Sequence, residues 1–385
     1  MTAVNPFKES TDMFLNAGGE ALQQCYQCGT CTAVCPWNLV REFPVRKIIH
    51  TSQIGLLTEV GEEDNWICAT CGACEERCPR GVKIIDIWRA IRRVGVQFDI
   101  LPKALKPVMS SLESQGNPWG DTRENRVAWT KGLDLSPFEK GMDVLYFPCC
   151  TPVYDRNARR IALASVSLLK KAGVNFGILG AEESCCGESA RKLGNEDLFQ
   201  KLAKSNIEIF KQKGVKKIVV SSPHCFHTFK NEYPELGADF EVIHMTQFVL
   251  QLIEQEKLRP EKPYPKKVIY HDPCYLGRHN KIYEEPRKVL SSIPDLQLIE
   301  FDNNREDALC CGGGGGRIWM ETPKEERLSN IRVDQALAAG AEVLALSCPY
   351  CMLNFDDSVL NMGKSGLLEV RDITEILDSV TGEIS

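Results

Sequence analysis

Clustered cysteines are the residues of this 385-residue chain that are best suited to chemistry. The chain has 18 of them, and they occur in tight groups rather than scattered along the sequence. Disulfide-rich proteins are usually short and secreted. This chain is long, and it begins with MTAVNPFKESTDMF, which lacks the basic and apolar regions of a secretory signal. The cysteines therefore indicate metal or redox sites rather than a disulfide framework.

Two short runs, CYQCGTCTAVCP and CATCGACEERCP, begin at Cys25 and Cys68. Both follow the C-x2-C-x2-C-x3-C-P spacing of two-cluster bacterial ferredoxins, in which the fourth cysteine of each run binds the other cluster. This spacing predicts two 4Fe–4S cubanes, one held by Cys25, Cys28, Cys31 and Cys78 and the other by Cys68, Cys71, Cys74 and Cys35. Zinc knuckles are the alternative, but zinc sites seldom use a fourfold run followed by proline.

The other ten cysteines form two sets of five that repeat along the chain. Equivalent cysteines are 124 to 126 residues apart, in the pairs Cys150 and Cys274, Cys185 and Cys310, and Cys225 and Cys351. The surrounding sequences agree as well, since DVLYFPCCTPVYDR matches KVIYHDPCYLGRHN, and GVKKIVVSSPHCFHTF matches GAEVLALSCPYCMLNF. This self-similarity predicts an internal duplication.

The second set combines a single cysteine, an adjacent pair and a C-x2-C motif: Cys274, Cys310, Cys311, Cys348 and Cys351. Five thiolates exceed what one cubane or one zinc ion needs. Five glycines, 312–316, follow the adjacent pair, and glycine permits the irregular backbone that brings neighbouring thiols to one centre. A phosphate-binding loop is a poor alternative, because Arg317 follows the glycines without the Gly-Lys-Ser/Thr sequence of such loops.

Each repeat alternates strand-like and helix-like segments, which predicts an α/β domain with short parallel strands. In the first repeat, 143–147 and 216–222 are apolar and strand-like, and 159–173 and 196–214 have helical periodicity. The cysteines then lie at strand ends, where ligands collect in such sheets. Upstream, the apolar spacing of 82–97 predicts a helix that packs on the cluster domain, with Arg89, Arg92 and Arg93 on its polar side.

The predicted fold class is α+β overall. A helix-rich two-cluster ferredoxin domain occupies residues 1–101, and residues 102–141, with several prolines and glycines, form a linker. Two duplicated α/β domains follow at 142–262 and 263–385. The net charge of −6 and the lack of a basic block argue against a nucleic-acid partner. No apolar run is long enough to predict a membrane span.

The doubled cysteine followed by glycine, with C-x2-C further on, resembles the cysteine-rich CCG domain. The segments CYQCGTCTAVCP, GNPWG, CCGESARKLGNE, HDPCYLGRHN and CCGGGGG resemble the D-subunit type of heterodisulfide reductase, in which a ferredoxin module precedes two CCG domains. The resemblance covers essentially the whole chain. It implies a non-cubane 4Fe–4S cluster on the five cysteines of the second set, and disulfide reduction in which paired clusters each take one sulfur.

The same resemblance implies an electron-donating partner, such as an HdrA-like flavoprotein or another redox subunit. It also implies a hetero-oligomeric complex in the cytoplasm of an anaerobe. Two functions stay open at this stage. One is disulfide or thiol redox catalysis, and the other is electron relay without a substrate inside a larger complex, including flavin-based bifurcating ones.

The first repeat departs from the family pattern, because alignment of SSPHC with SCPYC places Ser222 opposite Cys348. Four thiolates remain, which suffice for a second non-cubane cluster: Cys150, Cys185, Cys186 and Cys225. Cys149 or a histidine, His224 or His227 beside Cys225, is the candidate for the missing ligand, although an ordinary core or surface residue is the favoured interpretation of each histidine. A zinc site built from cysteine and histidine is the alternative to a cluster.

Other residues near the second set are candidates for chemistry. His271 and Asp272 can donate a proton to a leaving thiolate, or only support the end of a strand. Arg278 can bind an anionic substrate tail, with an ordinary salt bridge as the alternative. Gly312 and Gly313 can direct backbone amides at a substrate.

Overall fold

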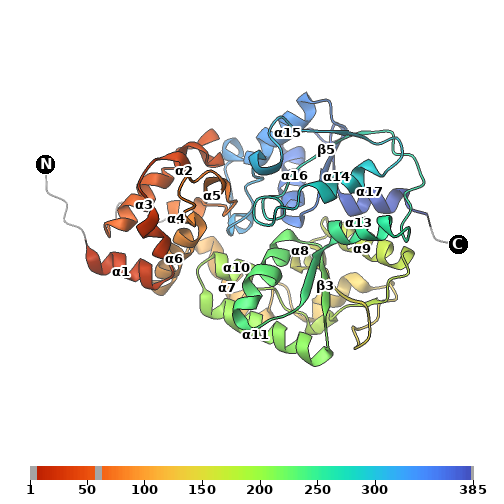
Figure 1. Ribbon diagram of the computed structural model, residues 1–385, viewed down its shortest axis with the longest axis horizontal. Helices are drawn as coiled ribbons and strands as arrows, with labels where there is room; N and C mark the ends of the chain where they lie inside the picture. Colours follow the sequence, from red (N-terminus) through yellow and green to blue (C-terminus); the bar gives the residue numbers. More distant parts are fainter. Residues whose placement is uncertain (1–6, 57–62, 383–385) are drawn as a thin grey trace.

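The computed structural model describes residues 7–56 and 63–382, which form a helical module and two α/β domains (Figure 1). The module, in red and orange, lies at one end of the molecule, beside both α/β domains. The first α/β domain, in yellow and green, lies below the second, in cyan and blue. The predicted fold class, α+β with two duplicated α/β domains, is confirmed.

Within residues 7–56 and 63–101, six α-helices build the N-terminal module. Their apolar faces meet in one core, in which Phe43 stacks on Trp88 with ring centroids 5.5 Å apart. Two short helices follow a glycine with positive φ, Gly29 (89°) and Gly72 (80°), which turns the chain inside each cysteine run. The helices are α1 (Lys8–Asn16), α2 (Thr30–Ala33), α3 (Val45–Gln53), α4 (Asp64–Ile67), α5 (Ala73–Glu76) and α6 (Ile84–Gln97).

Residues 102–141, predicted to be a linker, contain one α-helix, α7 (Lys106–Gln115), and the 3-10 turns Lys103–Leu105 and Glu124–Thr130. Val108 and Leu112 of α7 are buried in the core of the first repeat. This segment is therefore a structured connection that packs on the domain after it. The exact domain boundaries stay predictions.

Four short parallel strands form the sheet of the first repeat, in the order β2-β1-β3-β4. Val144 and Tyr146 of β1 face one core, whereas Leu145 and Phe147 face the other, so helices cover both sides of the sheet. The strands are β1 (Val144–Phe147), β2 (Phe176–Gly177), β3 (Lys217–Val220) and β4 (Glu241–His244). The helices are α8 (Cys150–Tyr154), α9 (Arg159–Lys171), α10 (Glu188–Lys192), α11 (Glu196–Lys213), α12 (Pro223–His227) and α13 (Met245–Glu254).

The sheet of the second repeat has the order β6-β5-β7-β8, which is the same topology. The same buried hydrogen bond occurs in both repeats. It joins the hydroxyl groups of Tyr146 and Ser221 at 2.9 Å in the first repeat, and those of Tyr270 and Ser347 at 2.7 Å in the second. The predicted duplication is thus confirmed. The elements are β5 (Lys267–Tyr270), α14 (Glu284–Ser291), β6 (Gln297–Ile299), α15 (Leu328–Ala338), β7 (Val343–Leu346), α16 (Pro349–Asn361), β8 (Glu369–Asp372) and α17 (Ile373–Val380).

The two repeats share a hydrophobic core. Helix α9 packs on α17 and α13 packs on α14, with Leu169, Leu290 and Leu377 among the buried side chains. The Lys171 ammonium donates to an Asp378 carboxylate oxygen at 2.8 Å across this interface. Among residues 7–56 and 63–382, no helix is long and apolar enough to span a lipid bilayer.

Candidate iron–sulfur sites

The module brings its cysteines together in the crossed pattern predicted from the two runs. Cys35, from the first run, lies with Cys68, Cys71 and Cys74 around one small cavity. Burial, followed by the neighbouring Cys71 and Cys68 thiols, raises the pKa of the Cys35 thiol. Such crowding of unpaired thiols fits a site that a metal cluster fills, because a bound cluster holds its cysteines as thiolates.

The other group of module cysteines lies nearer the surface. Cys31 is close to Cys25 and Cys28, and Cys28 and Cys78 both lie near the Tyr26 hydroxyl. Cys28 is exposed, and Tyr26 is 56% exposed. The outer group therefore includes an exposed cysteine, Cys28, whereas the inner cysteines are half-buried or, for Cys71, buried.

The glycine run of the second repeat lies directly against the inner cysteine loop of the module. A Cβ atom on Gly314 would lie 2.3 Å from the Ala69 carbonyl oxygen, and one on Gly315 would lie 2.3 Å from that of Cys68. Both distances are far below an ordinary contact, so only glycine permits this approach. The sequence predicted that the glycines bend the backbone around the cysteines, but it did not indicate this contact with the ferredoxin module.

Two buried arginines hold the module and the repeats together. Arg92 donates to the carbonyl oxygens of Cys68 and Gly315 at 2.8 Å each, and to that of Lys192 at 2.9 Å. The helical prediction for 82–97 is confirmed, but the placement of Arg92 on a polar outer side is wrong. Its side chain is fully buried, because three segments offer it carbonyl acceptors.

Arg278 is the other buried arginine, and it lies between the module and the second cysteine set. It donates to the carbonyl oxygens of Cys71 at 2.8 Å and Ala308 at 2.6 Å. Burial alone would lower the pKa of Arg278, but the neighbouring thiols of Cys71, Cys274 and Cys310 raise it above its usual value. Its donors are thus used for backbone contacts, and it does not line the cavity that contains Gly312.

The five cysteines of the second repeat form one continuous set of sulfur contacts. Cys310 lies beside Cys274 and Cys311, and Cys351 lies beside Cys311 and Cys348. The Cys311 and Cys351 sulfurs are 3.4 Å apart. The Gly312 amide donates to the Cys310 sulfur at 3.3 Å. All eighteen cysteines of the chain are free thiols, so this buried donor set fits the five-thiolate cluster expected from the family resemblance.

A contact between Cys71 and Cys310 joins the inner module group to this second set. Hydrogen bonding between the two thiols, ahead of burial, raises the pKa of Cys71. The two groups of cysteines come from segments more than two hundred residues apart in the chain, yet they are immediate neighbours in space.

His271 and Asp272 differ in their placement. One ring nitrogen of His271 and the sulfurs of Cys311 and Cys351 lie within 4.8 Å of one another. Burial lowers the pKa of His271. Asp272 instead accepts two hydrogen bonds from Arg287, at 2.7 and 2.9 Å. Of this predicted pair, the structure brings only His271 to the cysteines.

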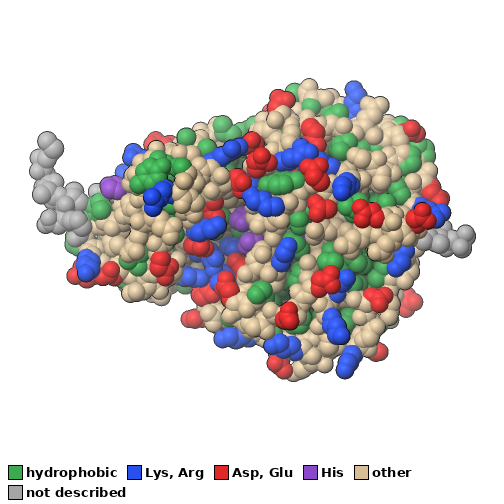
Figure 2. Space-filling view, viewed as in Figure 1, with side chains coloured by type: hydrophobic (Ala, Val, Ile, Leu, Met, Phe, Trp, Pro, Cys, Tyr) green, Lys and Arg blue, Asp and Glu red, His purple; other side chains and the backbone are tan. Residues whose placement is uncertain are grey.

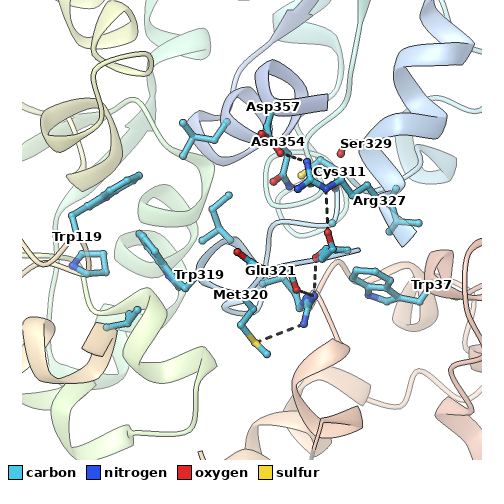
Figure 3. A pocket seen from close by; sticks show the side chains of 18 of the residues that line it. Trp37, Trp119, Cys311, Trp319, Met320, Glu321, Arg327, Ser329, Asn354 and Asp357 are labelled. Carbon is cyan, nitrogen blue, oxygen red and sulfur yellow. Dashed lines mark hydrogen bonds and ion pairs between the residues drawn. The ribbon is translucent and has the colours of Figure 1, made fainter. Parts of the chain in front are cut away.

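A cavity of about 620 Å³ reaches the second set at Cys311 and Gly312 (Figure 3). Apolar walls come from three parts of the chain, with Trp37 from the module, Trp119 from the 102–141 segment and Trp319 from the glycine loop. The Trp119 and Trp319 rings meet edge to face, 5.0 Å between centroids. Of the two glycines predicted to meet a substrate, Gly312 lines this cavity, whereas Gly313 is packed against the Asn354 amide. Sequence reasoning did not find the tryptophans, although GNPWG contains Trp119.

Arginines and acids supply the polar part of the same cavity. Arg317 stacks over the Trp37 ring at 5.5 Å and donates to the Thr322 hydroxyl at 2.7 Å. Arg327 pairs with Asp357. The cavity is therefore amphipathic, with aromatic walls and two guanidinium groups.

The five cysteines of the first repeat are buried, and their thiols lie close to one another in space. Cys150 hydrogen-bonds with Cys185, Cys186 with Cys225, and Cys225 with Cys149. Arg126, from the 102–141 segment, donates to the Cys150 sulfur at 3.5 Å and pairs with buried Glu183. Among the described residues that line the Cys311 cavity, there is none of these cysteines.

His224, the histidine candidate for the missing ligand of the first repeat, extends toward the second one. Its Nδ1 lies 3.0 Å from a Glu188 oxygen, and its ring hydrogen-bonds with Cys348. Burial favours the neutral ring, but Glu188 and Cys348 outweigh it and raise the pKa of His224 to about 10. Tyr350, its counterpart in the second repeat, lies near Cys185 and Cys225 of the first. Each repeat thus contributes one ring to the cysteine set of the other.

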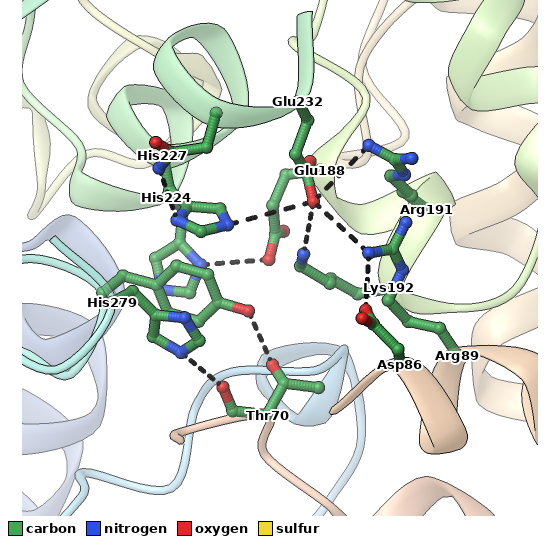
Figure 4. A network of polar contacts seen from close by, with 12 residues as sticks. Thr70, Asp86, Arg89, Glu188, Arg191, Lys192, His224, His227, Glu232 and His279 are labelled. Atoms are coloured by element: carbon green, nitrogen blue, oxygen red, sulfur yellow. Dashed lines mark hydrogen bonds and ion pairs between the residues drawn. The ribbon is translucent and has the colours of Figure 1, made fainter. Parts of the chain in front are cut away.

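A polar network continues from His224 toward the module (Figure 4). Glu232 accepts from Lys192 at 2.8 Å and lies 3.7 Å from Arg191. Burial opposes its charge, yet Lys192, His227 and the arginines lower its pKa well below the usual range. His227 and His279 line a cavity of about 640 Å³ between the module and the repeats, where Figure 2 shows basic and histidine side chains in a hollow.

Comparisons with known proteins agree with this division of the chain. Residues 21–82 match the 4Fe-4S dicluster domain family. Residues 144–230 and 268–356 each match the family described as cysteine-rich domain. The D subunit of dihydromethanophenazine:CoB–CoM heterodisulfide reductase from Methanosarcina barkeri is 33% identical, over 94% of this chain and 94% of its own length. The chain belongs to the heterodisulfide reductase D-subunit family.

Members and relatives of the heterodisulfide reductase D-subunit family include longer proteins. "Probable iron-sulfur-binding oxidoreductase FadF" from Bacillus subtilis is 38% identical over 84% of this chain. EtfAB:quinone oxidoreductase from Syntrophomonas wolfei is 37% identical over 88% of it. The chain spans about half the length of these two relatives, 47% and 49%. It is an iron–sulfur oxidoreductase subunit, and its domains support electron transfer.

Proposed function

We propose that this subunit passes electrons from two 4Fe–4S cubanes to a non-cubane cluster in the second repeat, which reduces a disulfide or a similar acceptor. The inner cubane is held by Cys35, Cys68, Cys71 and Cys74, and the outer one by Cys25, Cys28, Cys31 and Cys78. Cys274, Cys310, Cys311, Cys348 and Cys351 hold the non-cubane cluster.

One observation carries this proposal. The second cysteine set touches Cys71 of the inner group on one side, and Cys311 of the same set borders the 620 Å³ cavity on the other. A redox site that reduces a substrate needs both an electron donor and access to that substrate, and the second set has both. The cysteines of the first set are buried, and in the part of the chain that the structure describes none of them borders this cavity.

The chemistry asks for two electrons and two protons, since R–S–S–R′ then yields RSH and R′SH. A bound iron–sulfur cluster supplies such electrons one at a time. His271 is buried at the Cys311 sulfur, and its Nδ1 has no partner among the described residues. That free nitrogen supports a role in holding one proton near the leaving thiolate. The aromatic walls exclude water, and Arg317 and Arg327 suit a substrate with an anionic end.

Electrons enter at the exposed outer group in this scheme, from a partner such as an HdrA-like flavoprotein or another redox subunit. The exposure of Cys28 and Tyr26 supports this entry point. We further propose a hetero-oligomeric complex and a location in the cytoplasm. The alternative function is relay of electrons, without a substrate, inside a larger complex such as a flavin-based bifurcating one.

The test is an anaerobic assay in which reduced viologen donates electrons and the release of thiols from added disulfides is measured. We expect thiol release that Cys311→Ala abolishes, with the cubane spectra retained. Trp319→Ala should raise KM more than it lowers kcat, whereas Leu360→Ala, at a surface side chain 68% exposed, should change neither. Viologen oxidation by an artificial acceptor, without thiol release and without a thiol-induced paramagnetic signal, would leave the relay function and refute disulfide reduction.

A further inference from the structure

Cys149 has a backbone conformation that side chains rarely adopt. Its φ is 73° and its ψ is 160°, a region that is essentially restricted to glycine. Holding another residue there costs about 1–3 kcal/mol. Such strain persists only where the surrounding structure imposes it, and it is concentrated at functional sites. The side chain of Cys149 is also 2% exposed, so this strain serves a buried contact.

The strained backbone aims the thiol of Cys149 at the other cysteines of the first repeat. The Cys149 thiol is a close neighbour of the Cys225 thiol, and each acts on the pKa of the other. The Cys149 sulfur also lies 3.6 Å from the carbonyl oxygen of Phe147, which is a weak neutral contact. Since Cys225 touches Cys186, Cys149 extends the sulfur set of the first repeat from four to five.

Ser222, which aligns with the ligand Cys348 of the second repeat, is used differently. Its hydroxyl accepts from the His224 amide at 3.3 Å and caps helix α12. Cys348 begins the equivalent helix α16 without any side-chain cap, and its thiol contacts Cys351 instead. The first repeat has therefore lost a thiol at position 222 and has one at position 149.

The surroundings of the five sulfurs suit a buried anionic centre. The Arg126 guanidinium is 2% exposed, donates to the Cys150 sulfur and pairs with the Glu183 carboxylate. It gives the sulfur set a buried cationic contact at Cys150. Zinc takes four ligands in structural sites, so a zinc ion would leave one of the five thiols without a role.

We propose that Cys149 replaces Ser222 as the fifth thiolate of an iron–sulfur cluster in the first repeat, together with Cys150, Cys185, Cys186 and Cys225. The first repeat then keeps the five-sulfur stoichiometry of the second, with one ligand moved from the N-cap of α12 to the N-cap of α8. This inference concerns the first repeat alone and does not depend on disulfide reduction at the second.

The decisive variant is Cys149→Gly, because glycine suits the backbone and removes the sulfur without endangering the fold. Iron, acid-labile sulfide and zinc are measured per chain under anaerobic conditions, together with Mössbauer spectra. The wild-type chain should hold about sixteen irons and no zinc, and Cys149→Gly should hold about four fewer. The double variant Cys149→Gly with Ser222→Cys should recover the lost irons, because it restores a thiol at the usual position.

The remaining outcomes overturn the proposal. Full iron content in Cys149→Gly would show that the sulfur of Cys149 is not a ligand. About twelve irons and one zinc per wild-type chain would show that the first repeat is a zinc site. The signal of the second repeat should persist in every variant, so loss of disulfide reduction would count against the proposed function and not against this inference.

Discussion

Substitution of Gly315 by alanine tests whether close approach of the glycine loop connects the module with the second repeat. The new Cβ would lie 2.3 Å from the Cys68 carbonyl oxygen, where ordinary carbon–oxygen contacts are about 3.3 Å or longer. The two loops must therefore separate by about 1 Å. Displacement of a well-packed backbone costs about 1–3 kcal/mol. The positive φ of 60° adds about 1–2 kcal/mol for any residue with a Cβ.

Gly340→Ala is the matched control. Gly340 has a φ of 75°, and a Cβ there would meet nothing within 4 Å, so the control keeps the backbone strain and lacks the steric clash. The difference between the two variants isolates the clash at about 1–3 kcal/mol, which is a factor of roughly 5 to 150 in a local opening equilibrium.

The assay is anaerobic hydrogen exchange of the amides at 68–71, where local opening of the loop contact is visible. We expect these amides to exchange at least about fivefold faster in Gly315→Ala than in Gly340→Ala. Rapid-freeze paramagnetic resonance should also show slower reduction of the second-repeat cluster after the cubanes are reduced. Equal exchange and equal reduction rates in the two variants would refute the idea that the glycines serve this contact.

Three further predictions concern stability. Arg92→Met leaves buried carbonyls at Cys68, Gly315 and Lys192 without their donor, and should lower the free energy of unfolding by at least about 3 kcal/mol. Glu232→Gln leaves the buried Lys192 ammonium unpaired and should cost about 3–5 kcal/mol. Both are measured from anaerobic denaturant unfolding. Burial lowers the pKa of His244 to about 3, so the unfolded chain binds a proton below about pH 6.5 that the native chain rejects. Stability should therefore fall by about 1 kcal/mol from pH 6.5 to 5.5 through this residue, and His244→Asn, which keeps the cap of α13, should lack that part of the slope.

Each of these has its own control. Lys106→Met removes an exposed pair with Asp99 and should cost less than about 1 kcal/mol, so an equal effect of Arg92→Met would contradict the proposed clamp. Glu235 is 57% exposed in its pair with Arg191, and Glu235→Gln should likewise be mild. For His244, identical pH slopes in the wild-type and variant chains would show that its burial is not linked to stability.

The local sequence determined much of this protein. The spacing of the two module runs, the offset between the cysteine sets and the alternation of strand and helix are properties of short segments. Covalent geometry and hydrophobic periodicity control such segments, so their predicted fold class, parallel sheets and duplication are confirmed. The glycines after Cys311 were also singled out by sequence alone.

Only the tertiary structure decided which of these segments meet. Cys71 touches Cys310, His224 reaches Cys348, and Arg92 lies at the junction of three parts of the chain. No local pattern encodes such contacts, because they arise from the packing of the module and both repeats on one another. The same packing buries Arg92, which helical periodicity assigns to a polar face. It also distinguishes the two duplicated cysteine sets, since a cavity borders one and the other is enclosed.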